Sequence, residues 1–313
     1  MAARVFVFGS INTDLVVYVP RLPQPGETIG GGTYGSFPGG KGANQAVAAS
    51  RAGADVELYG CLGDDAFGRE RIVSLQKTGI STRGVRMLAD AASGIAQITV
   101  DSSGENTIVV APGANDRFVP EGVRLPSPAR GETWVSLFQN EVPQETTEEL
   151  ILAARSAGHL VFWNLAPTLS RRPSDDALHA LDCLICNRNE LADLTGRPRL
   201  SSDDPHGVEE DARAPLGWGV RSLIVTLGRN GSMHLTAEGV TAVRAYDVTA
   251  VDTVGAGDCY CGVLAASVAQ GMEMPQAMRR ASAAAAISTT RKGAQPSMPS
   301  RLEIDEFVSR QEP

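Results

Sequence analysis

The stretch Asp252-Thr253-Val254-Gly255-Ala256-Gly257-Asp258 carries the residue types that anion chemistry requires. Two glycines flanking an alanine let backbone N–H groups turn toward one point, and the small, apolar run from Cys259 to about Gln270 predicts a helix behind them. The positive end of the helix dipole favours an anion at that point. Asp258 falls in the first turn, where its carboxylate can accept a proton from an attacking group. This pattern indicates phosphoryl transfer, although an ordinary acidic helix N-terminus would explain the same residues in isolation.

A polar pair follows the first predicted strand. Arg4 to Gly9 is a continuous apolar run, typical of a strand buried on both faces of a parallel sheet. If the chain stays extended beyond it, the side chains of Asn12 and Asp14 project to the same side. An amide and a carboxylate in that arrangement can bind vicinal hydroxyls, as on a sugar. A polar turn after the strand is the alternative interpretation.

The segment Gly35-Ser-Phe-Pro-Gly-Gly-Lys-Gly-Ala-Asn44 begins as a P-loop does. Gly42 stands where a P-loop requires Ser or Thr to hold magnesium, and no hydrophobic strand precedes the segment. The pattern instead predicts a glycine turn into a helix over Lys41 to Ala52. Lys41 and Asn44 then share one face of its first turn and can meet the polar pair described above.

A small sheet is expected apart from the helices. Glu27-Thr28-Ile29 and Thr33-Tyr34 read as short strands in a stretch rich in proline and glycine. Ile95 to Val100 and Asn106 to Val110 flank a turn at Asp101 to Gly104, which predicts a hairpin. We interpret these strands as a lid that excludes water from the reaction.

An α/β alternation resumes at Trp134, and polar residues recur where strands end. The predicted strands are Trp134 to Phe138, Leu160 to Asn164, Asp182 to Cys186 and Leu223 to Thr226. Glu145 to Ala157 and the alanine-rich Pro275 to Arg291 are predicted helices. Open α/β sheets bind ligands at the carboxyl ends of their strands, so this edge is the expected site. The glycine turn Leu227 to Gly231 suits close approach of a nucleotide or a tight hairpin.

Composition limits the class of protein. The chain has 313 residues, a formal net charge of -8 and a pI near 5.1, which argue against a nucleic-acid or anionic-membrane surface. The N-terminus reads as a strand without a signal peptide, and no segment is apolar for long enough to span a membrane. Five cysteines are an odd number, so we expect free thiols in a reducing cytoplasm. Cys183 and Cys186 are interpreted as strand residues, and Asp65 as a helix cap.

Together these motifs resemble those of the ribokinase-like carbohydrate and nucleoside kinases. The likeness runs from Gly9 to Ser297 and is most specific at Gly39 to Ala49 and Asp252 to Asp258. It implies a three-layer αβα sandwich around a mostly parallel sheet, with a small β-sheet lid. The implied core is 1–11, 41–93 and 113–313, and the implied lid is 12–40 and 94–112. The resemblance also implies a homodimer that pairs through the lids.

The resemblance further implies roles for individual residues. The sugar site would contain Asn12, Asp14, Gly40, Lys41, Asn44, Glu141 and Asp258. The anion hole would be Gly255, Ala256 and Gly257, and the nucleotide site Asn187, Thr226, Gly228, Gly231, Gly257 and Ser282. Glu190, in the pattern Asn187-Arg188-Asn189-Glu190, would bind Mg2+ through water. A K+ site would use Asp252, Val254, Ser288, Arg291, Gly293 and Ser297, mostly through backbone carbonyls.

The implied reaction is transfer of the ATP γ-phosphoryl group to the 5-hydroxyl of D-ribose. An ordinary aspartate, with a pKa near ~4, is too weak a base to deprotonate an alcohol outright. Asp258 would therefore orient the hydroxyl and accept its proton late, while the anion hole stabilises the moving charge. A kinase for another sugar or a nucleoside, and a non-catalytic sugar or nucleotide sensor on the same scaffold, are the alternatives. A nicotinamide dehydrogenase is disfavoured because no G-x-G-x-x-G follows the first strand.

Overall fold

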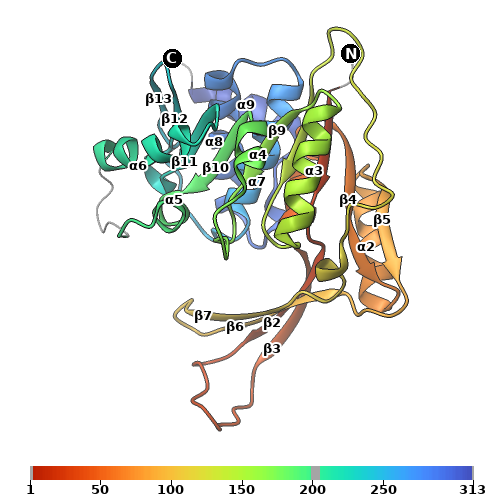
Figure 1. Cartoon of the computed structure of the whole chain (residues 1–313). Helices are drawn as coiled ribbons and strands as arrows, with labels where there is room; N and C mark the ends of the chain where they lie inside the picture. The colour runs from red at the N-terminus through yellow and green to blue at the C-terminus, as the bar shows by residue number, and fades with distance from the viewer. Residues whose placement is uncertain (1–2, 199–204, 312–313) are drawn as a thin grey trace.

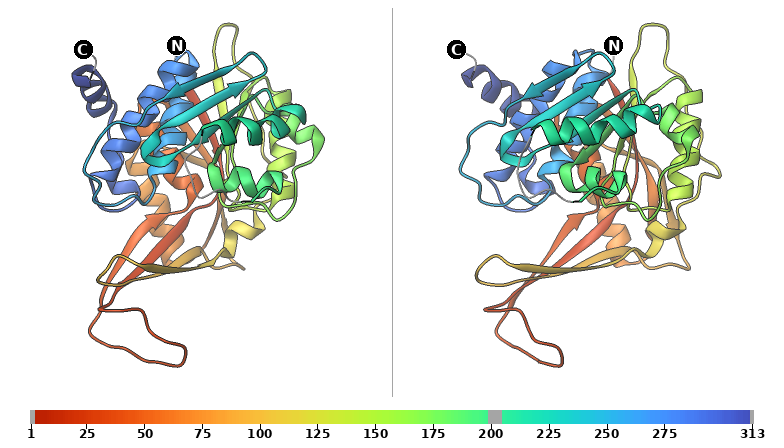
Figure 2. Two further views of the ribbon diagram at one scale, coloured as in Figure 1. Left: turned by 90° about the vertical axis from the view of Figure 1, so that its left-hand side faces the viewer. Right: turned by 60° about the vertical axis from the view of Figure 1, so that its left-hand side comes forward.

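A layered body and a small projecting sheet make up the chain (Figures 1 and 2). The computed structural model describes residues 3–198 and 205–311. The core ranges predicted from the resemblance also include 1–2, 199–204 and 312–313, which lie outside the described residues. Both ends of the chain lie on the side of the body away from the small sheet (Figure 1). Within the described residues, no helix is long and apolar enough to cross a bilayer.

The body is built on a nine-stranded sheet in the order β13-β12-β11-β10-β9-β8-β1-β4-β5. All pairs from β5 to β11 are parallel, and β12 and β13 add antiparallel hairpins at one edge. Its strands are β1 Arg4–Phe8, β4 Asp55–Gly63, β5 Ser81–Leu88, β8 Trp134–Phe138, β9 Leu160–Asn164, β10 Cys183–Asn187, β11 Ser222–Thr226, β12 Ser232–Thr236 and β13 Val240–Val243. The predicted strands at Arg4, Trp134, Leu160, Asp182 and Leu223 are confirmed within a few residues at each end.

Helices cover both faces of this sheet because its central strands are apolar on both sides. In β1, Val5 and Val7 pack into one core cluster, whereas Phe6 and Phe8 pack into the other. The first face carries α1 Lys41–Arg51, α2 Ala66–Lys77, α7 Ala256–Ala269, α8 Met274–Thr289 and α9 Arg301–Gln311. The second carries α3 Gln144–Ser156, α4 Asp175–Ala180, α5 Arg188–Thr195 and α6 Pro205–Gly217. The predicted three-layer α/β architecture is thus observed.

Three helices pack closely because small residues line their contacts. An ideal Cβ on Gly262 of α7 would lie 2.3 Å from the carbonyl oxygen of Gln45 in α1, so only glycine permits this approach. An ideal Cβ on Gly42 would lie 2.6 Å from the carbonyl carbon of Gly9, at the end of β1. The glycine that breaks the P-loop pattern therefore lets the first turn of α1 contact the end of β1. Alanines of α8, such as Ala277 and Ala281, are fully buried, and their small side chains let α8 pack closely against its neighbours.

The small sheet has the order β3-β2-β6-β7 and projects beyond the carboxyl edge of the large sheet (Figure 1). Its strands are β2 Asn12–Tyr18, β3 Thr33–Gly39, β6 Gly94–Val100 and β7 Asn106–Ala111. The predicted hairpin corresponds to β6 and β7. The predicted strand at Glu27 to Ile29 is wrong, because Glu27 closes a local turn: its carboxylate pairs with Arg21 and accepts a hydrogen bond from the N–H of Gln24 at 2.9 Å.

The cysteine and cap predictions are also resolved by the fold. Cys183 and Cys186 are buried in β10, and all five cysteines are free and buried. Asp65 caps α2, because its Oδ1 accepts a hydrogen bond from the N–H of Gly68 at 2.8 Å. The described elements that bear on the site also include three short 3-10 turns, at Gly113–Arg117, Gly228–Asn230 and Gln295–Ser297.

Candidate active site

A cleft lies at the carboxyl ends of the parallel strands of the large sheet. It gathers residues from α1, the ends of β9, β10 and β11, and the first turn of α7. Its lining residues are Lys41, Asn164, Ala166, Ile185, Asn187, Glu190, Thr226, Gly255, Gly257, Asp258 and Cys261. Seven of the residues predicted for the sugar, nucleotide and metal sites and the anion hole therefore meet in one cleft, namely Lys41, Asn187, Glu190, Thr226, Gly255, Gly257 and Asp258.

Asp258 is held in the first turn of α7 and is only 7% exposed. Gly255 caps the helix with a φ of 76°, a conformation that favours glycine, and its ideal Cβ would lie 2.8 Å from the Cβ of Ala294. The Oδ2 atom of Asp258 accepts a hydrogen bond from Asn44 Nδ2 at 2.9 Å, and Oδ1 accepts one from Gln45 Nε2 at 3.0 Å. The carboxylate is thus fixed from two sides by α1.

Lys41 and Glu141 connect the cleft to the end of β8. Asp258 is the main cause of a raised pKa at Lys41, with further contributions from Glu141 and Glu190, while burial acts in the opposite direction. One oxygen of Glu141, Oε2, accepts hydrogen bonds from the backbone N–H of Lys41 at 2.9 Å and from the hydroxyl of Ser10. A carboxylate is favoured at that position because the N-terminus of α1 carries positive partial charge. Lys41 is therefore a cation among three carboxylates.

Asn12 and Asp14 lie at the start of β2, beside the turn at Gly39 and Gly40. The carboxylate of Asp14 lies over Gly39, whose ideal Cβ would be 2.1 Å from Oδ1, so a side chain there would displace it. Asn12 Oδ1 accepts a hydrogen bond from Asn115 Nδ2 at 2.7 Å, which orients the Asn12 amide. Burial raises the pKa of Asp14 to about 6; Glu141 and Asp258 add to the rise, and Arg71 opposes it.

These relations place the predicted sugar residues in one electrostatic cluster, although Asn12 and Asp14 are not among the lining residues of the cleft. Gly40 lies at the junction, since it caps α1 with a φ of 88° and its ideal Cβ would lie 2.7 Å from the N atom of Asn12. The Asn44 side chain already makes two hydrogen bonds within the protein. Its Oδ1 accepts from Gln295 Nε2 at 3.1 Å, and its Nδ2 donates to Asp258 Oδ2.

The predicted nucleotide residues are only partly brought together. Asn187 and Glu190 form a capping box at the start of α5: Asn187 Oδ1 accepts from the Glu190 N–H at 2.9 Å, and Glu190 Oε2 accepts from the Asn187 N–H at 2.7 Å. The pKa of Glu190 is raised, mainly by burial, although the hydrogen bond from the Asn187 N–H acts to lower it. Thr226 ends β11 and lines the cleft.

Gly228, Gly231 and Ser282 do not line that cleft. Gly231 adopts a φ of 96°, and its ideal Cβ would lie 2.0 Å from the carbonyl oxygen of Val243, so the hairpin between β11 and β12 requires glycine there. Ser282 is buried in α8. The hairpin alternative from the sequence is therefore confirmed for this turn.

The residues of the predicted K+ site lie in two adjoining segments: the loop before α7, and the last turn of α8 with the loop that follows it. Asp252 links these loops, since Oδ1 accepts from the Val254 N–H at 3.0 Å and Oδ2 from the Gly293 N–H at 2.8 Å. Ser288 ends α8, and Ser297 lies in the 3-10 turn that follows. No cluster of three or more His, Cys, Asp or Glu side chains suited to a metal ion occurs in residues 3–198 and 205–311. Any cation here would depend mainly on backbone carbonyls.

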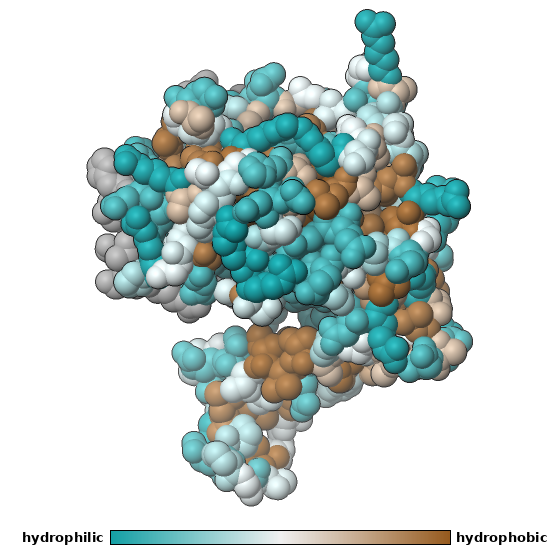
Figure 3. All heavy atoms as spheres, in the orientation of Figure 1, coloured by the Kyte–Doolittle hydropathy of each residue, from teal (hydrophilic) through white to brown (hydrophobic). Residues whose placement is uncertain are grey.

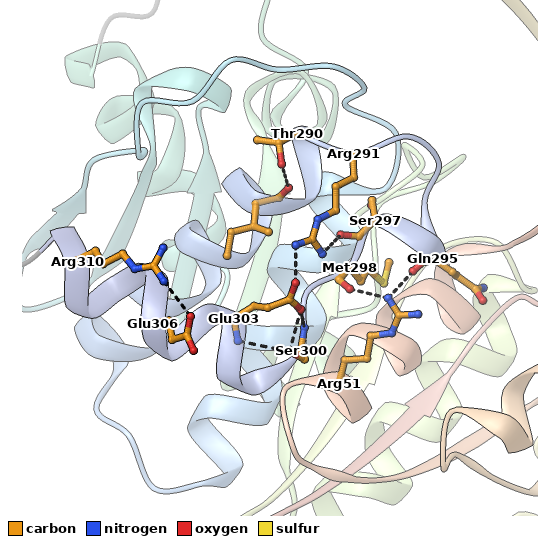
Figure 4. Close-up of polar contacts among 11 residues, drawn as sticks. Arg51, Thr290, Arg291, Gln295, Ser297, Met298, Ser300, Glu303, Glu306 and Arg310 are labelled. Atoms are coloured by element: carbon orange, nitrogen blue, oxygen red, sulfur yellow. Dashed lines mark hydrogen bonds and ion pairs between the residues drawn. The ribbon is translucent and has the colours of Figure 1, made fainter.

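Two arginines hold the second loop, as Figure 4 shows. Arg51 Nη1, from the end of α1, donates to the carbonyl oxygens of Gln295, at 2.9 Å, and Met298. Arg291 donates to the carbonyl of Ser297 at 3.5 Å and pairs with Glu303. Because Gln295 reaches Asn44, this loop is connected to Asp258 through one intervening side chain.

Several polar residues of the site carry no role in the sequence-based prediction: Ser10, Gln45, Gln139, Asn164 and Gln295. Gln139 and Asn164 follow or end predicted strands, which is the signal that could have identified them. Gln45 interrupts a run of small apolar residues in α1, and a buried amide in such a run also marks a polar contact.

Comparisons with known proteins agree with this geometry. The family model described as "pfkB family carbohydrate kinase" matches residues 2–301. Ribokinase from Schizosaccharomyces pombe is 37% identical over 313 residues, covering 96% of this chain and 96% of the relative. Deoxyribokinase from Salmonella typhi is 34% identical and covers 97% and 98%. The solved structure of Arabidopsis thaliana ribokinase complexed with ribose and ATP aligns with a TM-score of 0.88 at 29% identity, covering 98% of this chain and 99% of that chain. The chain therefore belongs to the pfkB family of carbohydrate kinases.

Proposed function

We propose that this protein is an ATP-dependent ribokinase that transfers the γ-phosphoryl group of ATP to the 5-hydroxyl of D-ribose. The observation that carries the proposal is the placement of Asp258: a carboxylate held by two amides, beside Lys41, in the first turn of a helix whose N-terminus opens to the cleft. Full-length relatives named ribokinase, and a solved relative complexed with ribose and ATP, support the choice of substrates.

In this proposal the sugar lies between Asp258 and the end of β1. Asp14 and the free oxygen of Glu141 accept sugar hydroxyls, and Lys41 balances the surrounding carboxylates. Asn12 and Asn44 donate their remaining amide hydrogens to the sugar. Gly40 contributes its backbone beside Asn12, where its ideal Cβ would lie 2.7 Å from the Asn12 N atom. The 5-hydroxyl then points to Asp258.

Asp258 acts as the base in a late proton transfer. Bond formation to a loose, metaphosphate-like phosphorus makes the attacking alcohol acidic, so a weak base in the right position suffices. The N–H groups of Gly255 and Gly257 face the transferring group at the N-terminus of α7 and stabilise its charge. The Ala256 N–H, which donates to the carbonyl oxygen of Thr253 at 3.2 Å, would have to turn from that oxygen to join them. The small sheet closes as a lid, which keeps water from competing with the sugar.

The nucleotide is proposed to lie along the ends of β10 and β11. Asn187 and Thr226 line the cleft there, and Gly228, Gly231 and Ser282 are assigned to the adenosine side. Glu190 suits magnesium, because the capping bond uses only Oε2 and leaves the other oxygen to accept from metal-bound water. Bound Mg2+ would neutralise phosphate charge during transfer.

A K+ ion is proposed near the same helix end. Hard oxygen donors suit a monovalent cation such as K+. The donors here are the Asp252 carboxylate and the carbonyls of Val254, Ser288, Arg291, Gly293 and Ser297. The bonds from Asp252 to Val254 and Gly293 already hold both loops at one place. Bound K+ would add positive potential at the anion hole.

We also propose a homodimer that pairs through the small sheets. Ile108, Val109 and Val110 of β7 are 55%, 67% and 49% exposed, and Tyr34 of β3 is 66% exposed. Figure 3 shows hydrophobic side chains gathered on the small sheet. Exposed apolar residues on a sheet edge favour association with a second copy. Cytoplasmic placement is proposed because all five cysteines are free thiols.

A substrate panel tests the proposed function. The purified chain is assayed for ADP release with Mg·ATP and ribose, 2-deoxyribose, a hexose or a nucleoside, because a deoxyribokinase is similar to the chain to nearly the same degree. The highest kcat/KM is expected for ribose. A higher value for 2-deoxyribose or a nucleoside would reassign the substrate, and absence of ADP release with every sugar would favour a non-catalytic sensor.

A further inference from the structure

Gln45 has no assigned contact with the sugar or the nucleotide, yet it lies at the centre of a buried set of hydrogen bonds. Its side chain is fully buried, as is that of Gln139 from the end of β8. Burying an amide costs free energy unless its polar atoms are paired. Gln45 meets this condition through three different segments, since it contacts Gln139, Asn164 and Asp258.

The direction of these bonds is determined by their donors and acceptors. Gln139 Nε2 donates to Gln45 Oε1 at 2.6 Å, so the nitrogen of Gln45 faces the other way. That nitrogen has two hydrogens, and it donates one to Asp258 Oδ1 and one to Asn164 Oδ1, both at 3.0 Å. Asn164 is anchored in turn, because its Nδ2 donates to the carbonyl oxygen of Ile185 at 3.2 Å.

The ends of β8 and β9 therefore orient the Gln45 amide, which contacts the base, and β10 holds Asn164 in place. The terminal torsion of an aspartate side chain has broad preferences, so the carboxylate of Asp258 depends on its hydrogen bonds for its angle. Asn44 holds Oδ2, but a single contact permits rotation about it. Gln45 supplies the second contact, on Oδ1, which removes that freedom.

We propose that Gln45 is a positioning residue that holds the Asp258 carboxylate at the angle from which it accepts the proton of the attacking hydroxyl. The proposal rests on the proposed kinase function. It predicts an effect on turnover rather than on binding, because Gln45 touches the base and does not line the cleft. A purely structural role, in attaching α1 to the sheet, would instead lower stability and leave turnover by the folded enzyme unchanged.

The test replaces Gln45 with methionine, which keeps the length of the side chain and removes its hydrogen bonds. We expect kcat to fall about 10- to 100-fold, the usual range for groups that orient a reacting residue, with KM for sugar and ATP within about threefold of the parent value. Val47→Ala is the matched control: Val47 is fully buried in the same helix and belongs to the apolar core. It should lower the Tm and leave kcat unchanged.

A double-mutant cycle distinguishes positioning from a general effect on the fold. In an Asp258→Asn background, Gln45→Met should lower the residual kcat less than about threefold, because residues that act as a unit are not additive. If Gln45→Met does not fold, Gln139→Met removes the group that orients Gln45 without touching Asp258, and it should lower kcat in the same way.

The outcomes separate the two proposals. An active parent whose Gln45→Met and Gln139→Met variants keep the parental kcat overturns the positioning role alone. The positioning role is also overturned if Gln45→Met lowers kcat by the same factor in the Asp258→Asn background as in the parent. A parent that phosphorylates no sugar overturns the proposed function, and the positioning role with it.

Discussion

Replacing Gly257 with alanine separates the stability of α7 from the chemistry in the cleft. Gly257 is the second residue of α7, and an ideal Cβ there meets no atom within 4 Å. Alanine is a better helix former than glycine by about 0.5–1 kcal/mol in a helix interior, and the lower figure suits a first turn. For a chain of this size that gain raises the Tm by about 1–2 °C. The fold therefore accepts the methyl group.

The same methyl group projects into the cleft, because Gly257 is one of its lining residues. It would keep the transferring phosphoryl group away from the backbone N–H groups at the start of α7. Loss of one such donor costs about 10²–10³ in kcat, or about 3–4 kcal/mol of transition-state stabilisation. We therefore expect a variant that is slightly more stable and at least about 100-fold slower.

The assay combines thermal unfolding with coupled ADP release under the same conditions. Gly217→Ala is the matched control, since Gly217 ends α6 and its ideal Cβ also meets no atom within 4 Å. It should change the Tm by a similar small amount and leave kcat/KM unchanged. A Gly257→Ala enzyme with kcat/KM within about threefold of the parent would refute the anion-hole assignment.

The remaining predictions concern the base, the sugar site, the packing of α1 and the cation. Asp258→Asn should lower kcat by about 10²–10⁴ while sugar and ATP still bind, as calorimetry would show; turnover near the parent rate would remove Asp258 from the mechanism. The pKa of Asp14 is raised to about 6, so its carboxylate is lost as the pH falls through that value. KM for the sugar should therefore rise below about pH 6. Asp14→Asn should have a high KM for the sugar at every pH without such a rise, and an equal rise in both enzymes would contradict this. Gly42→Ala would place a Cβ 2.6 Å from the carbonyl carbon of Gly9 and 2.7 Å from the N atom of Ser10, so urea unfolding should show a loss of about 1–3 kcal/mol, and unchanged stability would contradict that contact. Potassium salts should give faster turnover than sodium salts at equal ionic strength, and equal rates would count against the cation site.

The elements that carry the site were predictable because their signals are local. The apolar run before Gly9 predicted β1, and the glycines at Gly39 and Gly40 marked the start of α1. The same reasoning identified the first turn of α7 and placed Asp258 within it. Parallel strands bring their carboxyl ends to one edge, so the prediction of a parallel sheet also indicated the edge at which the cleft lies.

The contacts within the site were not predictable in the same way. Gln45, Gln139 and Asn164 are far apart in the chain and meet only after the sheet and α1 have packed. Nothing local in the sequence shows whether Gly231 closes a hairpin, approaches a nucleotide, or does both. The strand expected at Glu27 failed because the chain turns there, and the Glu27 N–H donates to the carbonyl oxygen of Gln24 at 2.9 Å instead of to a neighbouring strand.

The most direct test of the account is to identify the product. Parent enzyme, ribose and Mg·ATP are incubated and followed by phosphorus NMR, with Asp258→Asn in parallel. We expect one new phosphate monoester on carbon 5 of the sugar, formed together with ADP by the parent and only after far longer times by the variant. A phosphate on another carbon, no sugar phosphate at all, or equal rates in the two enzymes would contradict the claim that this cleft phosphorylates ribose with Asp258 as its base.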